Sequence, residues 1–288
     1  MTDDTDKKPI DQLYEIPPVP MVADRIIRLL DDRKATISEM QDAIMVDQTL
    51  SARMLRMANS AFYSSGRKIS TVSDAILTMG HCALRQLILA TSSRDLYKNF
   101  GLIERKLWEH SIGVSVASAL IAQEVAYPHI EEAAIAGLMH DIGKVIMDNA
   151  NPEKFELLYK AVHDKRMPYH VLEGSFFQHG HAEVGGLLAV KWGFPTNLCA
   201  AIKRHHFFAS YNDVSDLGTQ DATLCCAVIL GDALCVRLGI GFNGPMEDMP
   251  LKDKESREIL GIGEEKVPEL VESLKRAYVV EKLNYQAD

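Results

Sequence analysis

The chain has 288 residues, of which 47% are hydrophobic and 25% are charged. This composition supports one large or two modest globular domains and excludes long disorder, collagen-like repeats and low-complexity architecture. Forty acidic residues against 31 Lys and Arg leave a formal net charge of -9. Because phosphate contacts need a concentrated basic face, nucleic acid is not an expected partner, although a local patch can bind a phosphorylated small molecule.

The N-terminal segment gives no sign of membrane targeting. Met1 to Pro20 is polar, acidic and interrupted by proline, without the apolar core of a signal peptide. The longest purely apolar stretch, Leu224 to Leu230, is far shorter than the ~18 residues of a membrane span. The five cysteines form no CxxC pair and are expected to be reduced. We therefore expect a cytoplasmic protein without membrane contact.

Helical patterns dominate the first hundred residues, where no convincing strand pattern of period two occurs. Apolar residues recur at helical spacing from Val22 onwards. Thr36 with Glu39 three residues later is a capping-box pattern that predicts a short helix to about Met45. Asp47 is positioned to cap the helix that follows.

Two further helices are predicted before residue 100. Thr71 and Asp74 open the first of them, and Gly80 is its expected C-terminal stop. The second runs from about Ala83 to Leu96. Together these patterns predict an all-α N-terminal half.

The second half is also predicted to be helical. A long helix from Trp108 to Ala126 is rich in small residues, which permit close packing, and ends before Pro128. Glu131 to His140 has a nearly all-apolar body and is expected to be central. The remaining predicted helices are Pro152 to Lys165, His181 to Trp192, Asn197 to His205, Ala222 to Leu238 and Val267 to Tyr278.

The sharpest candidate site is the pair His140-Asp141, which directly follows an apolar helix. A buried imidazole beside a carboxylate is costly unless the two groups are paired or bind a metal. Adjacent helical residues point about 100° apart, so a cation between them can take one nitrogen and one oxygen. Such ligands suit divalent Mn, Fe, Ni or Zn. The alternative is a helix C-terminus at which His140 meets the dipole and Asp141 begins a turn.

Asp232 adds weight to a metal site, because it lies in an otherwise apolar helix. A lone carboxylate there would carry a desolvation cost of several kcal/mol. Pairing with Arg85 or Arg204 is the structural alternative. Further histidines in helical contexts of the same half are His110, His181, His205 and His206. The other histidines are expected to be bystanders, because His163 sits at a solvated helix end and His129 and His170 fall in predicted loops.

Several distinct short motifs lie along both halves of the chain. In the first half they are Pro17-Pro18-Val19-Pro20, Asp47-Gln48-Thr49-Leu50, Ala58-Asn59-Ser60-Ala61, Ala75-Ile76 and Met79-Gly80. In the second half they are His181-Ala182-Glu183-Val184-Gly185, Lys191-Trp192, Pro195, Ala201-Ile202 and His205-His206. From roughly residue 13 to 240 the chain thereby resembles the HDOD family, the HD-related output domains of bacterial signalling proteins.

The resemblance implies an all-α fold in which an N-terminal helical half packs on an HD-domain-like half. We expect a flexible N-terminus over 1–15, the N-terminal helical half over 16–104, an HD-like metal-binding half over 105–245, and a C-terminal loop and helix over 246–288. Many members of the family have lost part of the HD metal set and serve as signalling or scaffold modules without demonstrated catalysis.

At the motif positions the sequence also resembles metal-dependent HD and HD-GYP phosphohydrolases. The positions that match are His110, the defining pair His140-Asp141, Lys144 of the HDxGK pattern, His181, the pair His205-His206, and the final Asp232. The glycine-tyrosine-proline signature is missing, and Lys106 stands where some HD-GYP enzymes have an acidic ligand.

Two functions follow as hypotheses. In the first, the protein is a phosphohydrolase acting on a nucleotide or other phosphoester with one or two divalent ions (Fe, Mn, Ni or Zn). His110, His140, Asp141 and Asp232 would hold one ion, and His181, His205 and His206 a second, with Asp141 as a bridge. Asp141 and Lys144 are the catalytic candidates. In the second, the metal is structural or absent, and the N-terminal half binds a protein signalling partner near Asn59 to Tyr63 or Pro17 to Pro20.

Overall fold

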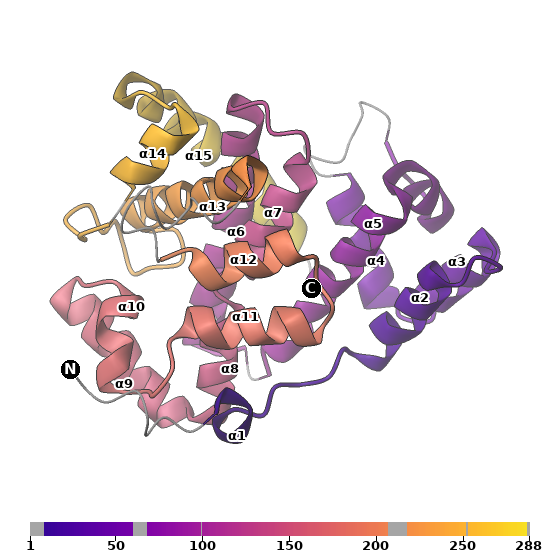
Figure 1. Ribbon diagram of the computed structural model, residues 1–288, viewed down its shortest axis with the longest axis horizontal. Helices are drawn as coiled ribbons and strands as arrows, with labels where there is room; N and C mark the ends of the chain where they lie inside the picture. The colour runs from indigo at the N-terminus through magenta and orange to yellow at the C-terminus, as the bar shows by residue number, and fades with distance from the viewer. Residues whose placement is uncertain (1–8, 60–67, 99, 207–217, 252, 287–288) are drawn as a thin grey trace.

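The computed structural model describes residues 9–59, 68–98, 100–206, 218–251 and 253–286. Over these residues the chain is helical and contains no β-strand, which confirms the predicted all-α class (Figure 1). None of the helices in the described part is long and apolar enough to cross a membrane. Of the partner surface predicted near Asn59 to Tyr63, residues 60–63 lie outside the described residues.

Helices follow one another along the whole described chain. The α-helices are α1 (Ile10–Leu13), α2 (Met21–Asp31), α3 (Ile37–Met45), α4 (Gln48–Ala58), α5 (Val72–Ser92), α6 (Leu102–Glu124), α7 (Ile130–Met139), α8 (Ile142–Ala150), α9 (Pro152–Lys165), α10 (Tyr169–Leu172), α11 (His181–Lys191), α12 (Thr196–Arg204), α13 (Thr219–Leu238), α14 (Lys254–Leu260) and α15 (Val267–Gln286). The 3₁₀ helices are η2 (Ser93–Leu96), η3 (Glu173–Ser175) and η5 (Glu264–Lys266).

The caps predicted for the first helices are present. The Thr36 hydroxyl accepts from Glu39 N at 3.2 Å, and Thr36 N donates to Glu39 Oε2 at 2.7 Å, which together form the capping box of α3. Leu50 N donates to the Asp47 carboxylate at 2.9 Å. Gly80 interrupts α5 with φ +73° and ψ 167°, a conformation that favours glycine, and the helix resumes directly after it.

Helices α6, α7 and α13 form the centre of the second half (Figure 1). Their backbones come close because small residues face one another. A Cβ on Gly137 of α7 would lie 2.6 Å from Val114 O of α6, and one on Gly231 of α13 would lie 2.9 Å from Ser118 Oγ. As expected, the apolar body of α7 is buried.

Helix α8 begins directly after Asp141, where a turn was one of the two alternatives and no helix was predicted. It crosses α11 at very short range, because a Cβ on Gly143 would lie 1.9 Å from His181 O. The first turns of the two helices therefore touch backbone to backbone. This contact brings Asp141, the N-cap of α8, beside His181, the first residue of α11.

The segment between α1 and α2, residues 14–20, is extended and runs past the end of α11; we call it the strap (Figure 1). Lys191 Nζ donates to Ile16 O at 2.5 Å, and Trp192 Nε1 donates to Pro17 O at 3.1 Å. Ile16 and Trp192 are themselves buried. The strap is therefore tied to the end of the helix that begins at His181.

Candidate metal centre

Every residue that the sequence placed in a metal site lies in one cluster. The contributing positions are His110 of α6, His140 and Asp141 at the α7–α8 junction, His181 at the start of α11, His205 and His206 directly after α12, and Asp232 of α13. All are buried except His206, which is half-buried. Residues up to 122 positions apart in the chain thus meet at one point.

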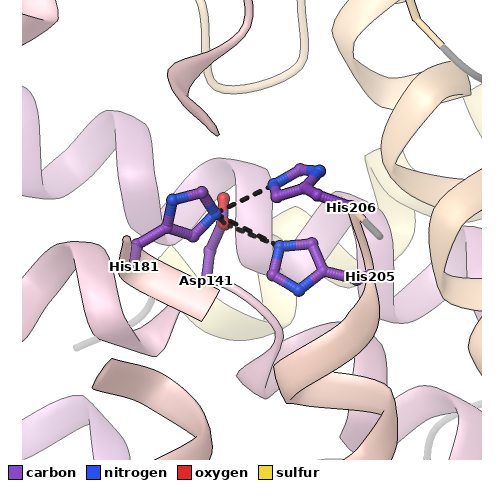
Figure 2. A group of neighbouring side chains, drawn as sticks. All are labelled: Asp141, His181, His205 and His206. Atoms are coloured by element: carbon purple, nitrogen blue, oxygen red, sulfur yellow. Dashed lines mark hydrogen bonds and ion pairs between the residues drawn. The ribbon is translucent and has the colours of Figure 1, made fainter. Parts of the chain in front are cut away.

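Asp141 occupies the centre of the cluster. Figure 2 shows the rings of His181, His205 and His206 directed at its carboxylate from two sides. Its Oδ1 lies 3.2 Å from His181 Nε2 and 3.5 Å from His205 Nε2. Its Oδ2 lies 3.2 Å from His140 Nε2 and 3.7 Å from His110 Nε2. The two oxygens therefore face different histidine groups, as a bridging carboxylate would.

Two residues complete the Oδ2 side. Asp232 Oδ1 lies 3.0 Å from His110 Nε2, so Asp232 extends the group formed by His110, His140 and Asp141. Lys144, also buried, places Nζ 2.5 Å from Asp141 Oδ2 and 4.1 Å from the ring centroid of Tyr169. The alternative partner Arg85 lies elsewhere, 2.7 Å from Asp31.

Hydrogen bonds fix which nitrogen of each ring carries a proton. Nδ1 of His110, His140 and His205 lies 3.0, 2.7 and 2.7 Å from the carbonyl oxygens of Ile240, Gly137 and Ile202, respectively. Because a carbonyl oxygen only accepts, each of these Nδ1 atoms must donate. Nε2 of each of these three rings therefore points into the cluster, the arrangement common among metal-binding histidines.

Ring nitrogens and carboxylate oxygens consequently crowd together at the centre. His181 Nε2 lies 3.2 Å from His205 Nε2 and 2.9 Å from His206 Nε2. Within the described part of the chain, the buried atoms His140 Nε2 and Asp141 Oδ1 have no hydrogen-bond partner. Leaving one such group unsatisfied costs about 1–3 kcal/mol, which a divalent cation among these nitrogens and oxygens would remove. The residues present fit a metal ion.

The titration behaviour of the cluster agrees with this donor set. Burial would raise the pKa of Asp141, but the charges of His140 and Lys144 outweigh it and hold that pKa well below its usual value. Burial lowers the pKa of His205 to about 4, and it also lowers that of His206. At neutral pH, Asp141 is therefore an anion, whereas His205 and His206 are neutral imidazoles that could each accept a metal ion.

His181 differs from the other histidines because its Nδ1 meets a carboxylate. Glu173 Oε2 lies 2.6 Å from His181 Nδ1 and accepts from His181 N at 3.1 Å. Burial opposes the charged ring, but Glu173 outweighs it and raises the pKa of His181 to about 9. A cation at Nε2 would therefore replace a proton. The sequence patterns did not predict a role for Glu173, and its only signal was an acid among apolar and aromatic neighbours.

His170, predicted to be a bystander in a loop, lies instead in α10. Its ring stacks on that of His206, with centroids 4.3 Å apart. It also lines a pocket of about 20 Å³ that reaches the cluster, together with His205, His206, Ile229, Asp232, Ala233 and Leu251. That volume holds about one water molecule.

Comparison with known proteins adds the context of the fold. The family model of the HDOD domain matches residues 16–208. An HDOD domain protein with unknown function from Geobacter sulfurreducens is similar in structure, with TM-score 0.63, 26% identity, and coverage of 93% of this chain and 95% of that chain. A protein from Shewanella amazonensis, named as a candidate phosphohydrolase, has TM-score 0.63, 23% identity and coverage of 93% and 91%; it supports the fold alone.

One relative is considerably longer. An uncharacterized protein from Treponema pallidum is 25% identical over 197 residues, which are 68% of this chain. The match spans 38% of that relative's length.

Proposed function

The chain belongs to the HDOD family, and from this premise we propose that it is a bacterial signalling protein whose divalent-metal centre hydrolyses a phosphoester. The observation that carries the proposal is the meeting of buried imidazole Nε2 atoms and carboxylates around Asp141, where His140 Nε2 and Asp141 Oδ1 have no hydrogen-bond partner among the described residues. Two divalent ions together with Lys144 would outweigh the charges of Asp141 and Asp232. The centre therefore suits an anionic substrate such as a nucleotide or another phosphoester.

The residues divide into two ligand groups. His110, His140, Asp141 and Asp232 would hold one ion, and Asp141, His181, His205 and His206 the other. Metal ions in such a centre lower the pKa of water and stabilise charge that develops on phosphoryl oxygens. Carbonyl acceptors hold the rings of His110, His140 and His205 in the ligating tautomer. Lys144 pairs with Asp141 and adds positive charge on the same side.

The second candidate function is a non-catalytic signalling module with a structural metal. The space beside the cluster favours it, because room for about one water molecule is what a closed structural site requires. In that case the output would be capture of a protein partner by the N-terminal half, and Asn59 and the strap residues Pro17 to Pro20 are the described parts of the two predicted contact surfaces.

Elemental analysis of protein purified without added metal, followed by a hydrolysis screen, tests the proposal. The screen uses bis-p-nitrophenyl phosphate, nucleotides and cyclic dinucleotides with Mn²⁺, Fe²⁺, Ni²⁺ or Zn²⁺. Asp141→Asn should abolish turnover and reduce bound metal. Asp164→Asn is the matched control, because it changes the exposed aspartate of the second His-Asp dipeptide. Bound metal without turnover would favour the second candidate, and protein that takes up no metal would refute the metal centre.

A further inference from the structure

A short segment behind the metal centre touches three of its residues. This backing segment, residues 169–175, comprises α10 and η3. Its Tyr169 ring lies under Lys144 Nζ, its His170 stacks on His206, and its Glu173 contacts His181. These three contacts are made to Lys144, His206 and His181, and none of them is made to Asp141. The segment thus lies one layer outside the ligand atoms.

Glu173 makes the most specific of the three contacts. Its Oε2 meets two donors of one residue, the backbone N of His181 at 3.1 Å and the ring Nδ1 at 2.6 Å. This pair of bonds fixes both the start of α11 and the rotation of the ring. Glu173 is 6% exposed, so water competes little for the carboxylate.

The neighbouring glycine leaves room for this carboxylate. A Cβ on Gly180 would lie 2.5 Å from Glu173 Oε1, too close for an unshifted side chain. The φ of Gly180 is -79°, which any residue adopts, so space rather than backbone conformation requires glycine here. Any side chain at position 180 would displace Glu173.

His181 is also the member of the ligand set whose Nδ1 faces an anion. His110, His140 and His205 direct Nδ1 at neutral carbonyl oxygens. A charged acceptor strengthens the hydrogen bond and increases the basicity of the opposite nitrogen. Nε2 of His181 is therefore a stronger donor to a cation than carbonyl-bonded imidazoles are. The effect is confined to one of the two ligand groups.

We propose that Glu173 is a positioning residue for the cation held by Asp141, His181, His205 and His206, and that it sets the affinity of this position separately from the other. The inference rests on the proposed metal centre. Loss of an outer carboxylate of this kind typically weakens metal binding by about 10–100-fold. Loss of Glu173 should therefore affect one position and spare the one formed by His110, His140, Asp141 and Asp232.

Calorimetric titration with Co²⁺, read in parallel by its d–d absorption, tests the inference. Wild-type protein should bind two Co²⁺ ions, and Glu173→Gln should weaken one of them by about 10–100-fold. Glu183→Gln is the matched control: Glu183 accepts from Gly180 N at 3.1 Å in the same helical turn but makes no hydrogen bond to His181. It should leave both affinities unchanged.

Single-position backgrounds identify which ion is affected. The variant His110→Ala keeps the position formed by Asp141, His181, His205 and His206, and adding Glu173→Gln to it should weaken Co²⁺ binding by the whole 10–100-fold expected, which is about the effect of an outer carboxylate. The variant His206→Ala keeps the other position, and adding Glu173→Gln to it should leave Co²⁺ affinity unchanged. Gly180→Ala displaces the same carboxylate without changing it and should reproduce the weakening, even if Glu173→Gln fails to fold.

The outcomes separate the two proposals. If the wild type binds no Co²⁺, the metal centre itself is refuted. If the wild type binds two ions and both Glu173→Gln and Gly180→Ala leave each affinity unchanged, only the role of Glu173 is overturned. Equal weakening at both positions, or a lower melting temperature with unaltered Co²⁺ affinity and spectrum, would also overturn it, because either result indicates a merely structural residue.

Discussion

Gly143→Ala should disrupt the metal centre from outside its ligand set. The added Cβ would lie 1.9 Å from His181 O and 2.7 Å from Gly185 N, both of them backbone atoms that no rotamer change can move. Real Cβ atoms approach no closer than 3.0 Å, so α8 and α11 must separate by about 1.1 Å. Asp141 begins one helix and His181 the other. A site whose ligand distances tolerate about 0.2 Å cannot absorb that shift.

The expected result is a loss of both cation affinity and stability. Overpacking of this kind costs about 1–3 kcal/mol, or roughly 2–4 °C in Tm for each kcal/mol in a chain of this size. Gly174→Ala is the control, because nothing lies within 4 Å of its added Cβ. Calorimetric melting and Co²⁺ titration of both variants provide the measurement. A Gly143→Ala protein that melts and binds Co²⁺ as the wild type does would refute the claim that this backbone contact sets the ligand geometry.

Three other outcomes are expected. Burial and the charge of Glu104 raise the pKa of Asp148 from 3.8 to about 6, so the folded state holds this proton more tightly than the unfolded state and loses stability as the pH rises through 6. Asp148→Asn should therefore raise the free energy of unfolding at pH 8 by about 1 kcal/mol, after allowance for partial exposure. Melting curves should show this as a higher Tm at pH 8 and no gain near pH 4. Re-adding a divalent ion at 100 times its Kd to chelator-treated protein should restore about 2.7 kcal/mol in denaturant titrations, and an unchanged midpoint would argue against binding to the folded state. Trp192→Phe removes the hydrogen bond to Pro17 O and should lower the free energy of unfolding by about 1 kcal/mol. Relative to the wild type, amide hydrogen exchange should become faster in the strap and stay unchanged in α3.

The local features of the fold were predictable where a few neighbouring residues determine them. The Thr36 and Glu39 capping box needs only a four-residue pattern, and it appears as expected. Gly80 is a second example, because it breaks the helical geometry as predicted and a further helical stretch follows it. That the two stretches adjoin directly, with no loop between them, depends on packing beyond the local pattern.

The members of the His and Asp cluster were predictable from the sequence, but the residues that support them were not. Buried polar residues such as Asp232 stand out in an apolar sequence because they need partners, whatever the fold. Glu173 and Gly143 carry no such signal. Gly143 resembles a helix breaker, although it lies in the first turn of α8 and permits contact with α11. Glu173 contacts His181 because the loop between η3 and α11 turns the chain back, and the spacing of the residues in the sequence does not predict that turn.

Helix α11 joins two parts of the molecule that are far apart along the chain. It has 11 residues, a rod of about 16 Å with His181 at one end and the Lys191 anchor of the strap close to the other. The anchoring bonds close a loop of 175 residues, which costs substantial chain entropy and favours their late formation during folding. The strap and the cluster are therefore coupled through one rigid element, whose two ends hold the Ile16 carbonyl and the His181 imidazole.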